Sequence, residues 1–243
     1  MLTVTINMKL EVFDDADSVA RAAAATIAAE ARAAIAARGR FALAVSGGHT
    51  PWIMLRTLAS EDIFWVGLHV FQVDERVAPD GHPDRNLTHL RESLLQLAPL
   101  RPEQIHAMPV ESQDLEAAAI QYADTLREVT GSPPVLDLIH LGLGPDGHAA
   151  SLVPGDAVLG VANADVAPTA VYQGRRRMTL TYPAINRARR ILWVVTGGEK
   201  EEMLQRLHNG DVSIPAGRVV REQALVLADR AAAGRLAAEY KRG

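Results

Sequence analysis

Four short apolar segments of this chain each end in a polar or glycine-rich turn. The most informative stretch, Leu136–His148, reads LDLIHLGLGPDGH. The other apolar runs are Phe41–Val45, Leu68–Val73 and Ile191–Thr196, which lead into SGGHTP, DER and GGEK. A strand that stops at such a turn leaves its last side chains and backbone N–H groups beside a cleft, where glycine lets a ligand come close. The pattern predicts a ligand site at the carboxyl ends of neighbouring strands.

Helical patterns separate these strands. Asp17–Arg38 is alanine-rich, with apolar residues four apart and Gly39 as a stop. A second helix is expected to run through Leu58, with Thr50 as its N-cap and Pro51 at its first position. Further helices are expected over about 86–97, 114–130, 201–208 and 229–241, and strands over 177–181 and 224–228, whereas 155–170 has little pattern.

This alternation of strands and helices predicts an α/β fold. The expected architecture is a mostly parallel sheet flanked by helices on both faces, of the Rossmann-like type. No internal repeat, linker or composition break divides the chain, so a single domain is expected over residues 1–243.

Composition excludes several classes of protein. The chain has no cysteine, so disulfides, thiolate metal sites and a cysteine nucleophile are excluded. A net charge of −4 argues against a nucleic-acid partner, although six arginines gather between residues 175 and 190. No signal-peptide pattern begins the sequence, and the longest apolar stretches are too short to span a bilayer. We therefore expect a cytoplasmic protein with no membrane partner.

His148 is the candidate for proton transfer. Imidazole exchanges protons near neutral pH, and the position of His148 directly after Asp146-Gly147 places it in the predicted cleft. Asp146 is close enough to orient the ring or to cap the next helix. General base is the natural role for His148. Four other histidines are expected to be core or surface residues with satisfied hydrogen bonds: His69, His106, His140 and His208.

The loop SGGHTP predicts an anion site. It joins a strand to a helix amino terminus, whose free N–H groups and dipole favour a phosphate. The candidate ligands in the loop are Ser46, Gly47, Gly48 and Thr50. A tight turn with a threonine cap is the alternative interpretation. It is not a P-loop, because no Gly-Lys-Ser/Thr follows at the required spacing.

Lys200 lies in the turn after another strand. It is either a solvated lysine or a point-charge ligand for the same phosphate.

The segment Gly142–Gly147 formally matches G-x-G-x-x-G. A dinucleotide fold would also need an acidic residue at the end of the next strand, about 20 residues on. The nearest candidate, Asp165, does not terminate an apolar strand, and the motif lies in the middle of the chain. We therefore expect no nicotinamide cofactor.

Asp74-Glu75-Arg76 places two carboxylates and a guanidinium at a strand end. Because side chains alternate along a strand, Asp74 and Arg76 should share one side while Glu75 faces away. A surface ion pair is the alternative interpretation. A metal site with the nearby His82 and His89 lacks a recognised ligand spacing, so no metal is expected.

Taken in order, these segments resemble the 6-phosphogluconolactonase family. That family carries S-G-G-S-T-P, then D-E-R with a downstream histidine and S-N, then G-x-G-P-D-G-H-T-A-S-L-F-P, R-x-T-L and G-x-x-K. The matching segments here are 46–51, 74–76 with His82 and Asn86, 142–154, 177–180 and 197–200. The similarity extends from about Leu10 to the carboxyl terminus. Four residues depart from the pattern, namely His49, Arg85, Ala149 and Val153, and the first two bear on the phosphate and substrate contacts.

The resemblance implies a fold shared with glucosamine-6-phosphate deaminases and related sugar-phosphate isomerases. It also implies metal-independent hydrolysis of 6-phospho-D-glucono-1,5-lactone, the second step of the oxidative pentose phosphate pathway, on a small-molecule substrate and without a cofactor. We expect a monomer or a homodimer.

A mechanism follows as a hypothesis. The 6-phosphate would lie on the loop at Gly47, Gly48 and Thr50, with Arg177 and Lys200 completing its charge neutralisation. His148 would take a proton from the attacking water, and Asp146 would hold its tautomer. Asp74 would shape the sugar site. The oxyanion would meet either Arg76 or N–H groups of the glycine-rich turn around Gly144. A lactone is an activated ester, so Ser151 is expected to be a helix or substrate contact instead of a nucleophile.

Two alternatives remain open. Deaminase or isomerase chemistry on the same fold expects D-E-Y in place of Asp74-Glu75-Arg76, and an acidic residue soon after the histidine. Ala149–Gly155 contains none. The other alternative is a sugar-phosphate-binding module without catalysis. Such modules usually carry a DNA-binding domain, for which the residues before Phe41 leave no room.

Overall fold

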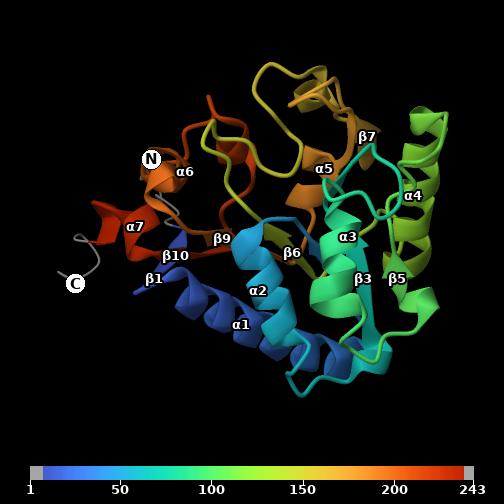
Figure 1. Cartoon of the computed structure of the whole chain (residues 1–243), viewed down its shortest axis with the longest axis horizontal. Coiled ribbons are helices and arrows are strands. Elements are labelled where there is room, and N and C mark those ends of the chain that lie inside the picture. The colour runs from blue at the N-terminus through green and yellow to red at the C-terminus, as the bar shows by residue number, and fades with distance from the viewer. Residues whose placement is uncertain (1–7, 238–243) are drawn as a thin grey trace, which may run out of the picture.

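The computed structural model describes residues 8–237 and is built on a seven-stranded parallel sheet (Figure 1). The strand order is β1-β10-β9-β6-β2-β3-β5. The strands are β1 (Lys9–Phe13), β2 (Phe41–Val45), β3 (Leu68–Gln72), β5 (Ile105–His106), β6 (Leu138–Leu141), β9 (Arg190–Val195) and β10 (Ala224–Asp229). Every neighbouring pair is parallel, which confirms the predicted fold class.

Helices cover both faces of this sheet. One face carries α1 (Ala16–Arg38), α2 (His49–Leu58) and α3 (Asn86–Leu90); the other carries α4 (Leu115–Thr130), α5 (Tyr182–Asn186), α6 (Glu201–His208) and α7 (Arg230–Ala233). The alternation of side chains explains two separate cores: Leu43 packs with α1 and α2, whereas Ala42 and Ala44 pack in the cluster of α4 to α7. Both faces of each central strand are buried, so these strands are continuously apolar. No helix within residues 8–237 is long and apolar enough to cross a membrane.

The order of the strands places a crevice beside β2. From β2 the chain proceeds through α2 to β3 on one side, whereas β6, on the other side, leads on to β9 and β10. The connections therefore leave β2 and β6 in opposite directions. In open α/β sheets, ligands bind outside the carboxyl ends of the strands at such a switch point. Here those ends carry Ser46 and Gly142.

A second, smaller sheet stands beside this crevice. It is antiparallel, in the order β4 (Asp74–Arg76), β8 (Arg177–Leu180) and β7 (Val166–Pro168). The predicted strand over 177–181 is confirmed to Leu180, but it pairs with β4 and not in the main sheet. Strand β7 lies in the region where the sequence showed little pattern, because a strand of this length has no readable periodicity. The small sheet brings Arg76 opposite Arg177.

Most helix bounds agree with the sequence, but several elements differ, and the short elements α5 and β5 were not predicted. Helix α2 begins at His49 with Gly48 as its N-cap, so Thr50 is not the cap. The helix expected over 86–97 is α3 followed by a π-helical turn over Arg91–Leu95. Strand β1 was not predicted. Helix α7 ends at Ala233, because Gly234 has φ 45°, and the part of the predicted helix beyond residue 237 lies outside the described residues.

Glu75 holds α3 against β4. Its carboxylate is fully buried, and it accepts hydrogen bonds from the backbone N–H groups of Arg76 (2.7 Å), Asn86 (2.8 Å) and Leu87 (2.8 Å). The Gln72 amide donates a fourth bond of 2.8 Å, and the Arg85 guanidinium lies 3.5 Å away. Glu75 faces away from Asp74 and Arg76, as predicted. The alternative interpretation, a surface ion pair, is wrong for Glu75, because its buried carboxylate anchors the N-terminus of α3.

We expect Glu75→Gln to lower the free energy of unfolding by about 3–5 kcal/mol, because the amide presents a donor where the protein already supplies donors. Chemical denaturation followed by circular dichroism measures the change. Glu111→Gln is the matched control, since Glu111 is an exposed partner of the same Arg85 at 3.5 Å and should contribute at most about 1 kcal/mol. Equal unfolding midpoints for the two variants would contradict the anchoring role.

Candidate active site

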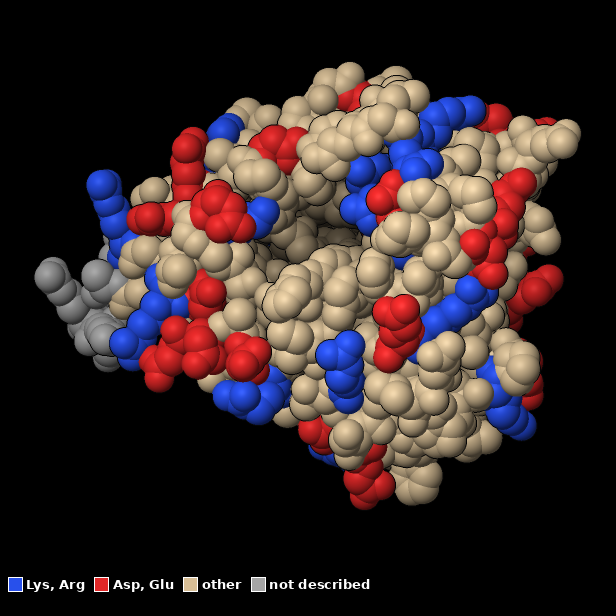
Figure 2. Space-filling model, viewed as in Figure 1, with Lys and Arg blue, Asp and Glu red and all other residues tan. Residues whose placement is uncertain are grey.

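A cavity of about 350 Å³ opens at the carboxyl ends of β2, β6 and β9. Figure 2 shows it as a hollow with Lys and Arg side chains on opposite sides of its mouth. Its charged lining residues are Arg76, Arg177, Lys200, Asp74 and Glu199. The polar turns that follow the strands thus meet in one place, as the sequence predicts.

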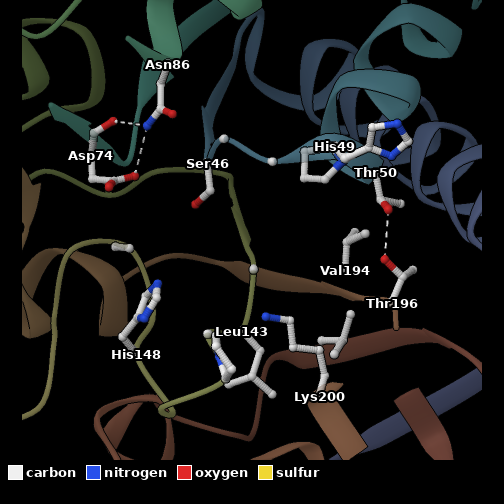
Figure 3. Close-up of a pocket in the computed structure, with 18 of the residues that line it drawn as sticks. Ser46, His49, Thr50, Asp74, Asn86, Leu143, His148, Val194, Thr196 and Lys200 are labelled. Atoms are coloured by element: carbon white, nitrogen blue, oxygen red, sulfur yellow. Dashed lines mark hydrogen bonds between the residues drawn. The ribbon is translucent and has the colours of Figure 1, made fainter. Parts of the chain in front are cut away.

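His148 and Asp146 form a dyad in the turn after β6. His148 Nδ1 lies 2.6 Å from Asp146 Oδ1, and the same oxygen accepts a 3.2 Å bond from the His148 N–H. Because an ionised carboxylate only accepts hydrogen bonds, Nδ1 carries the proton in the neutral imidazole. Nε2 is then the ring nitrogen that can take a proton from a bound molecule. Figure 3 shows the His148 ring standing in the cavity wall.

The glycines of this turn make room for the dyad. A Cβ on Gly144 would lie 2.1 Å from His148 Nδ1 and 2.7 Å from Asp146 Oδ1. Gly147 has φ 82°, a conformation that other residues rarely adopt. The turn is closed by bonds from Gly144 N to His148 O (2.8 Å) and from Gly147 N to Gly144 O (3.0 Å). The glycines of the G-x-G-x-x-G match therefore leave room for the imidazole ring of His148.

The turn lacks the partner that a dinucleotide would need. Asp165 forms ion pairs with Arg187 and with Arg127, the latter at 3.3 Å. Its carboxylate is thus committed to α4 and the segment after α5, away from the cavity lining.

The loop Ser46–Pro51 forms the opposite wall. Gly48, with φ 133°, leads into α2, so the first N–H groups of this ten-residue helix have no intrahelical partner. The Ser46 hydroxyl donates to the His140 carbonyl (3.0 Å). The Thr50 hydroxyl lies 2.8 Å from that of Thr196 and so joins α2 to the end of β9 (Figure 3). His49, one of the departures from the family pattern, is exposed.

Lys200 and two arginines supply the positive charge of the cavity. Lys200 follows β9, and Figure 3 shows its ammonium group directed toward the middle of the cavity. Arg76 donates to Asn86 Oδ1 (2.9 Å) and to the Asp84 carbonyl (3.0 Å). Arg177 is 4% exposed, and burial lowers the pKa of its guanidinium.

Asp74 is fixed from two sides. Its Oδ2 accepts a 2.5 Å bond from the Ser151 hydroxyl, and its backbone carbonyl accepts a 3.0 Å bond from the Asn86 amide. Ser151 is fully buried and lies outside the cavity lining, and its hydroxyl holds Asp74. Arg85 lies outside the cavity lining, in the buried contact with Glu75, so this departure does not alter the cavity wall.

Three other histidines, namely His140, His69 and His106, make structural contacts. His140 is buried behind the cavity, its Nδ1 accepts a bond from Ser46 N (3.3 Å), and burial lowers its pKa to about 3. It is therefore neutral near pH 7. His69 and His106 contact each other at the sheet edge, 3.1 Å apart. Within residues 8–237 no group of three or more metal-ligating side chains gathers, and His82 instead contacts Arg175.

Two polar residues of the site, one beside the dyad and one in the opposite wall, were not predicted. Tyr172 donates to Asp146 Oδ2 at 3.1 Å, and Thr196 pairs with Thr50. Tyr172 lies in the connection before β8, for which the sequence predicts no element. The family pattern has no residue that corresponds to it. Thr196 ends a predicted strand, and its position beside two other strand ends was the available signal.

We expect Gly144→Ala to displace the His148 ring and to break the 2.6 Å contact with Asp146, because the new methyl group overlaps Nδ1. Nitrogen-detected NMR of the imidazole should show loss of the hydrogen-bonded Nδ1–H signal. Gly160→Ala is the control, since a Cβ there meets nothing within 4 Å. A variant that keeps the wild-type imidazole signal would show that the turn accommodates the methyl group.

Comparisons with known proteins identify the family of this chain. Residues 14–227 match the model of the family described as glucosamine-6-phosphate isomerases/6-phosphogluconolactonase. The 6-phosphogluconolactonase of Mycobacterium tuberculosis is 36% identical over 245 residues, which cover 95% of this chain and 99% of that protein.

Solved structures show the same fold. The 6-phosphogluconolactonase of Thermotoga maritima superposes with a TM-score of 0.81 at 25% identity, over 91% of this chain and 98% of that one. A monomeric glucosamine-6-phosphate deaminase gives a TM-score of 0.80 at 20% identity, over 93% of this chain and 99% of that one, which shows the fold alone. The chain belongs to the glucosamine-6-phosphate isomerase/6-phosphogluconolactonase family.

Proposed function

We propose that this chain hydrolyses 6-phospho-D-glucono-1,5-lactone to 6-phospho-D-gluconate in the oxidative pentose phosphate pathway. The observation that carries the proposal is the His148–Asp146 dyad in the same cavity as a helix amino terminus and Lys200. Relatives that match nearly the whole chain at 33–36% identity are 6-phosphogluconolactonases, which supports the same reaction here.

The substrate's phosphate is proposed to lie on the Gly47-Gly48-Thr50 loop. The open N–H groups at the start of α2 and the helix dipole favour a dianion there. Lys200 and Arg177, which line the same cavity, complete the charge neutralisation. Anchoring the phosphate places the lactone carbonyl beside His148, and such positioning contributes several kcal/mol to the reaction.

Hydrolysis then proceeds by proton transfer through His148. Nε2 takes a proton from water while the water oxygen bonds to C1, which produces a tetrahedral oxyanion. The C1–ring oxygen bond breaks next, and the imidazolium returns the proton to the ring oxygen. Asp146 holds the tautomer with its 2.6 Å contact to Nδ1. Asp74, held by Ser151, shapes the sugar site.

Of the two oxyanion donors considered, we propose Arg76, because three N–H groups of the turn are already engaged. The N–H groups of Gly144, Gly147 and His148 already donate within the turn. Pro145 has no N–H to offer. Arg76 lines the cavity from β4 and carries a permanent positive charge, so we assign it the stabilisation of the oxyanion.

The deaminase alternative has less support. Its pattern expects an acidic residue soon after the histidine, whereas here Ala149 is fully buried and the next hydroxyl, of Ser151, is engaged by Asp74. We also propose that the enzyme works in the cytoplasm, as a single domain and as a monomer or homodimer, on a small molecule and without a cofactor.

The decisive assay follows the disappearance of 6-phosphogluconolactone, made in situ from glucose 6-phosphate and its dehydrogenase, with EDTA present. Wild type should accelerate hydrolysis above the spontaneous rate, and His148→Ala should lower kcat by about 10²–10⁴-fold, because the base is lost. No acceleration by wild type would refute the lactonase; deamination of glucosamine 6-phosphate and ligand binding would then be tested. Full activity in the variant would refute the mechanism alone.

Lys200→Ala separates binding from chemistry. We expect KM to rise about 10–100-fold with kcat changed only a few-fold, because the lost charge–phosphate contact acts equally on the ground state and the transition state. Steady-state kinetics measure both constants. Lys9→Ala is the control, since Lys9 is an exposed strand residue paired with Glu11. An unchanged KM in Lys200→Ala would place the phosphate elsewhere.

A further inference from the structure

We propose that Tyr172 is a positioning residue for the proposed general base: its hydroxyl occupies Asp146 Oδ2 and so sets how strongly Asp146 acts on the His148 ring. The proposal rests on the role given to His148 above. Tyr172 donates to Asp146 Oδ2 at 3.1 Å, while Asp146 Oδ1 receives His148 Nδ1 at 2.6 Å. The two carboxylate oxygens are thus divided between one residue that reacts and one that orients.

A tight hairpin holds Tyr172 in place. Tyr172 and Arg175 exchange two backbone hydrogen bonds, of 2.9 and 3.3 Å, across the pair Gln173-Gly174. Both of these central residues have positive φ, 50° and 79°, the conformation of the two-residue turns that close β-hairpins. The hairpin joins β7 to β8, so the small sheet fixes where the Tyr172 ring lies.

The Tyr172 ring is packed from two sides. Its centroid lies 5.7 Å from that of His148 with the planes at 69°, an edge-to-face contact. The Arg177 guanidinium carbon lies 5.0 Å from the Tyr172 centroid, within the range of a cation–π contact. Arg177 also donates to the Gln173 side chain at 3.2 Å. Tyr172 therefore links a proposed phosphate ligand to the dyad.

The direction of the hydrogen bond is set by its surroundings. Burial and the Asp146 carboxylate raise the pKa of the Tyr172 hydroxyl, so it stays protonated and donates. Burial works to raise the pKa of Asp146, but His148 and the hydrogen bonds from His148 and Tyr172 together hold that pKa below its ordinary value. Asp146 is consequently an acceptor throughout the working range of a histidine.

Removing the Tyr172 hydroxyl should change the pH dependence of the enzyme in a definite direction. Without the Tyr172 donor, the Asp146 carboxylate keeps more of its negative charge for His148 and stabilises the imidazolium better. We therefore expect the Tyr172→Phe enzyme to reach its active, basic form only at higher pH than wild type. The other charged groups that share the cavity are unchanged by this variant: Arg76 and Asp74 from β4, Arg177 from β8, and Glu199 and Lys200 after β9.

The test compares Tyr172→Phe with wild type and with Tyr182→Phe. Tyr182 donates to the Pro215 carbonyl at 2.8 Å outside the cavity lining and is the matched control. We expect the ascending limb of kcat/KM, measured from about pH 5 to 8 and corrected for spontaneous hydrolysis, to move up by roughly half a pH unit in Tyr172→Phe alone. Tyr172→Leu, which also loses the ring contacts with His148 and Arg177, should shift in the same direction, whereas Tyr172→Phe keeps the ring and assigns the effect to the hydroxyl.

A second measurement needs no substrate. NMR titration of the His148 imidazole, identified by its absence in His148→Ala, should give the same upward shift in Tyr172→Phe. Unshifted titrations in both Tyr172 variants, with wild type active, would overturn the positioning role and leave the lactonase intact. A shifted imidazole titration in a protein without lactonase activity would uphold the contact and refute the proposed function.

Discussion

The buried carboxylate of Glu75 is the interaction on which the cavity depends. It accepts four hydrogen bonds, three of them from backbone N–H groups, and two of those open α3. A buried charge without such partners would cost several kcal/mol, so the local chain has little freedom to rearrange. Asn86 is fixed in this way, and Asn86 in turn contacts Asp74 and Arg76. The Glu75 carboxylate is buried and does not line the cavity, but it positions the residues of β4 that do.

The wall formed by the turn after β6 is held by contacts within the turn itself. In the turn after β6, Asp146, Gly147 and His148 are neighbours in sequence, and three short-range hydrogen bonds close them into one shape. The dyad therefore needs few contacts from the rest of the chain to form. The positive charges, by contrast, arrive from β4, β8 and the segment after β9. The sheet's switch point brings these separate contributions together.

The features of the fold and site that can be predicted from the sequence are those with a local signal. The four strand ends, the parallel sheet and the placement of His148, Lys200 and the Ser46–Pro51 loop in one cavity all follow from short patterns. Contacts between residues far apart in the chain could not be predicted. The Thr50 hydroxyl meets Thr196, 146 positions away, instead of capping its own helix. The burial of Glu75 depends on donors from residues 85–87, and β7 is defined only by its pairing with β8.

The same distinction bears on the departures from the family pattern. Arg85 replaces a serine in the pattern, yet it lies 3.5 Å from Glu75 and is 2% exposed, so its charge is balanced by the anchor of α3 and not by a ligand. His49 lies in the phosphate loop with an exposed side chain, whereas the N–H groups of the loop belong to the backbone and do not depend on that side chain. A phosphate site made of backbone N–H groups tolerates a changed side chain such as His49. The buried ion pair with Glu75 keeps the changed side chain of Arg85 out of the cavity. The cavity can therefore keep its chemistry while the residues around it change.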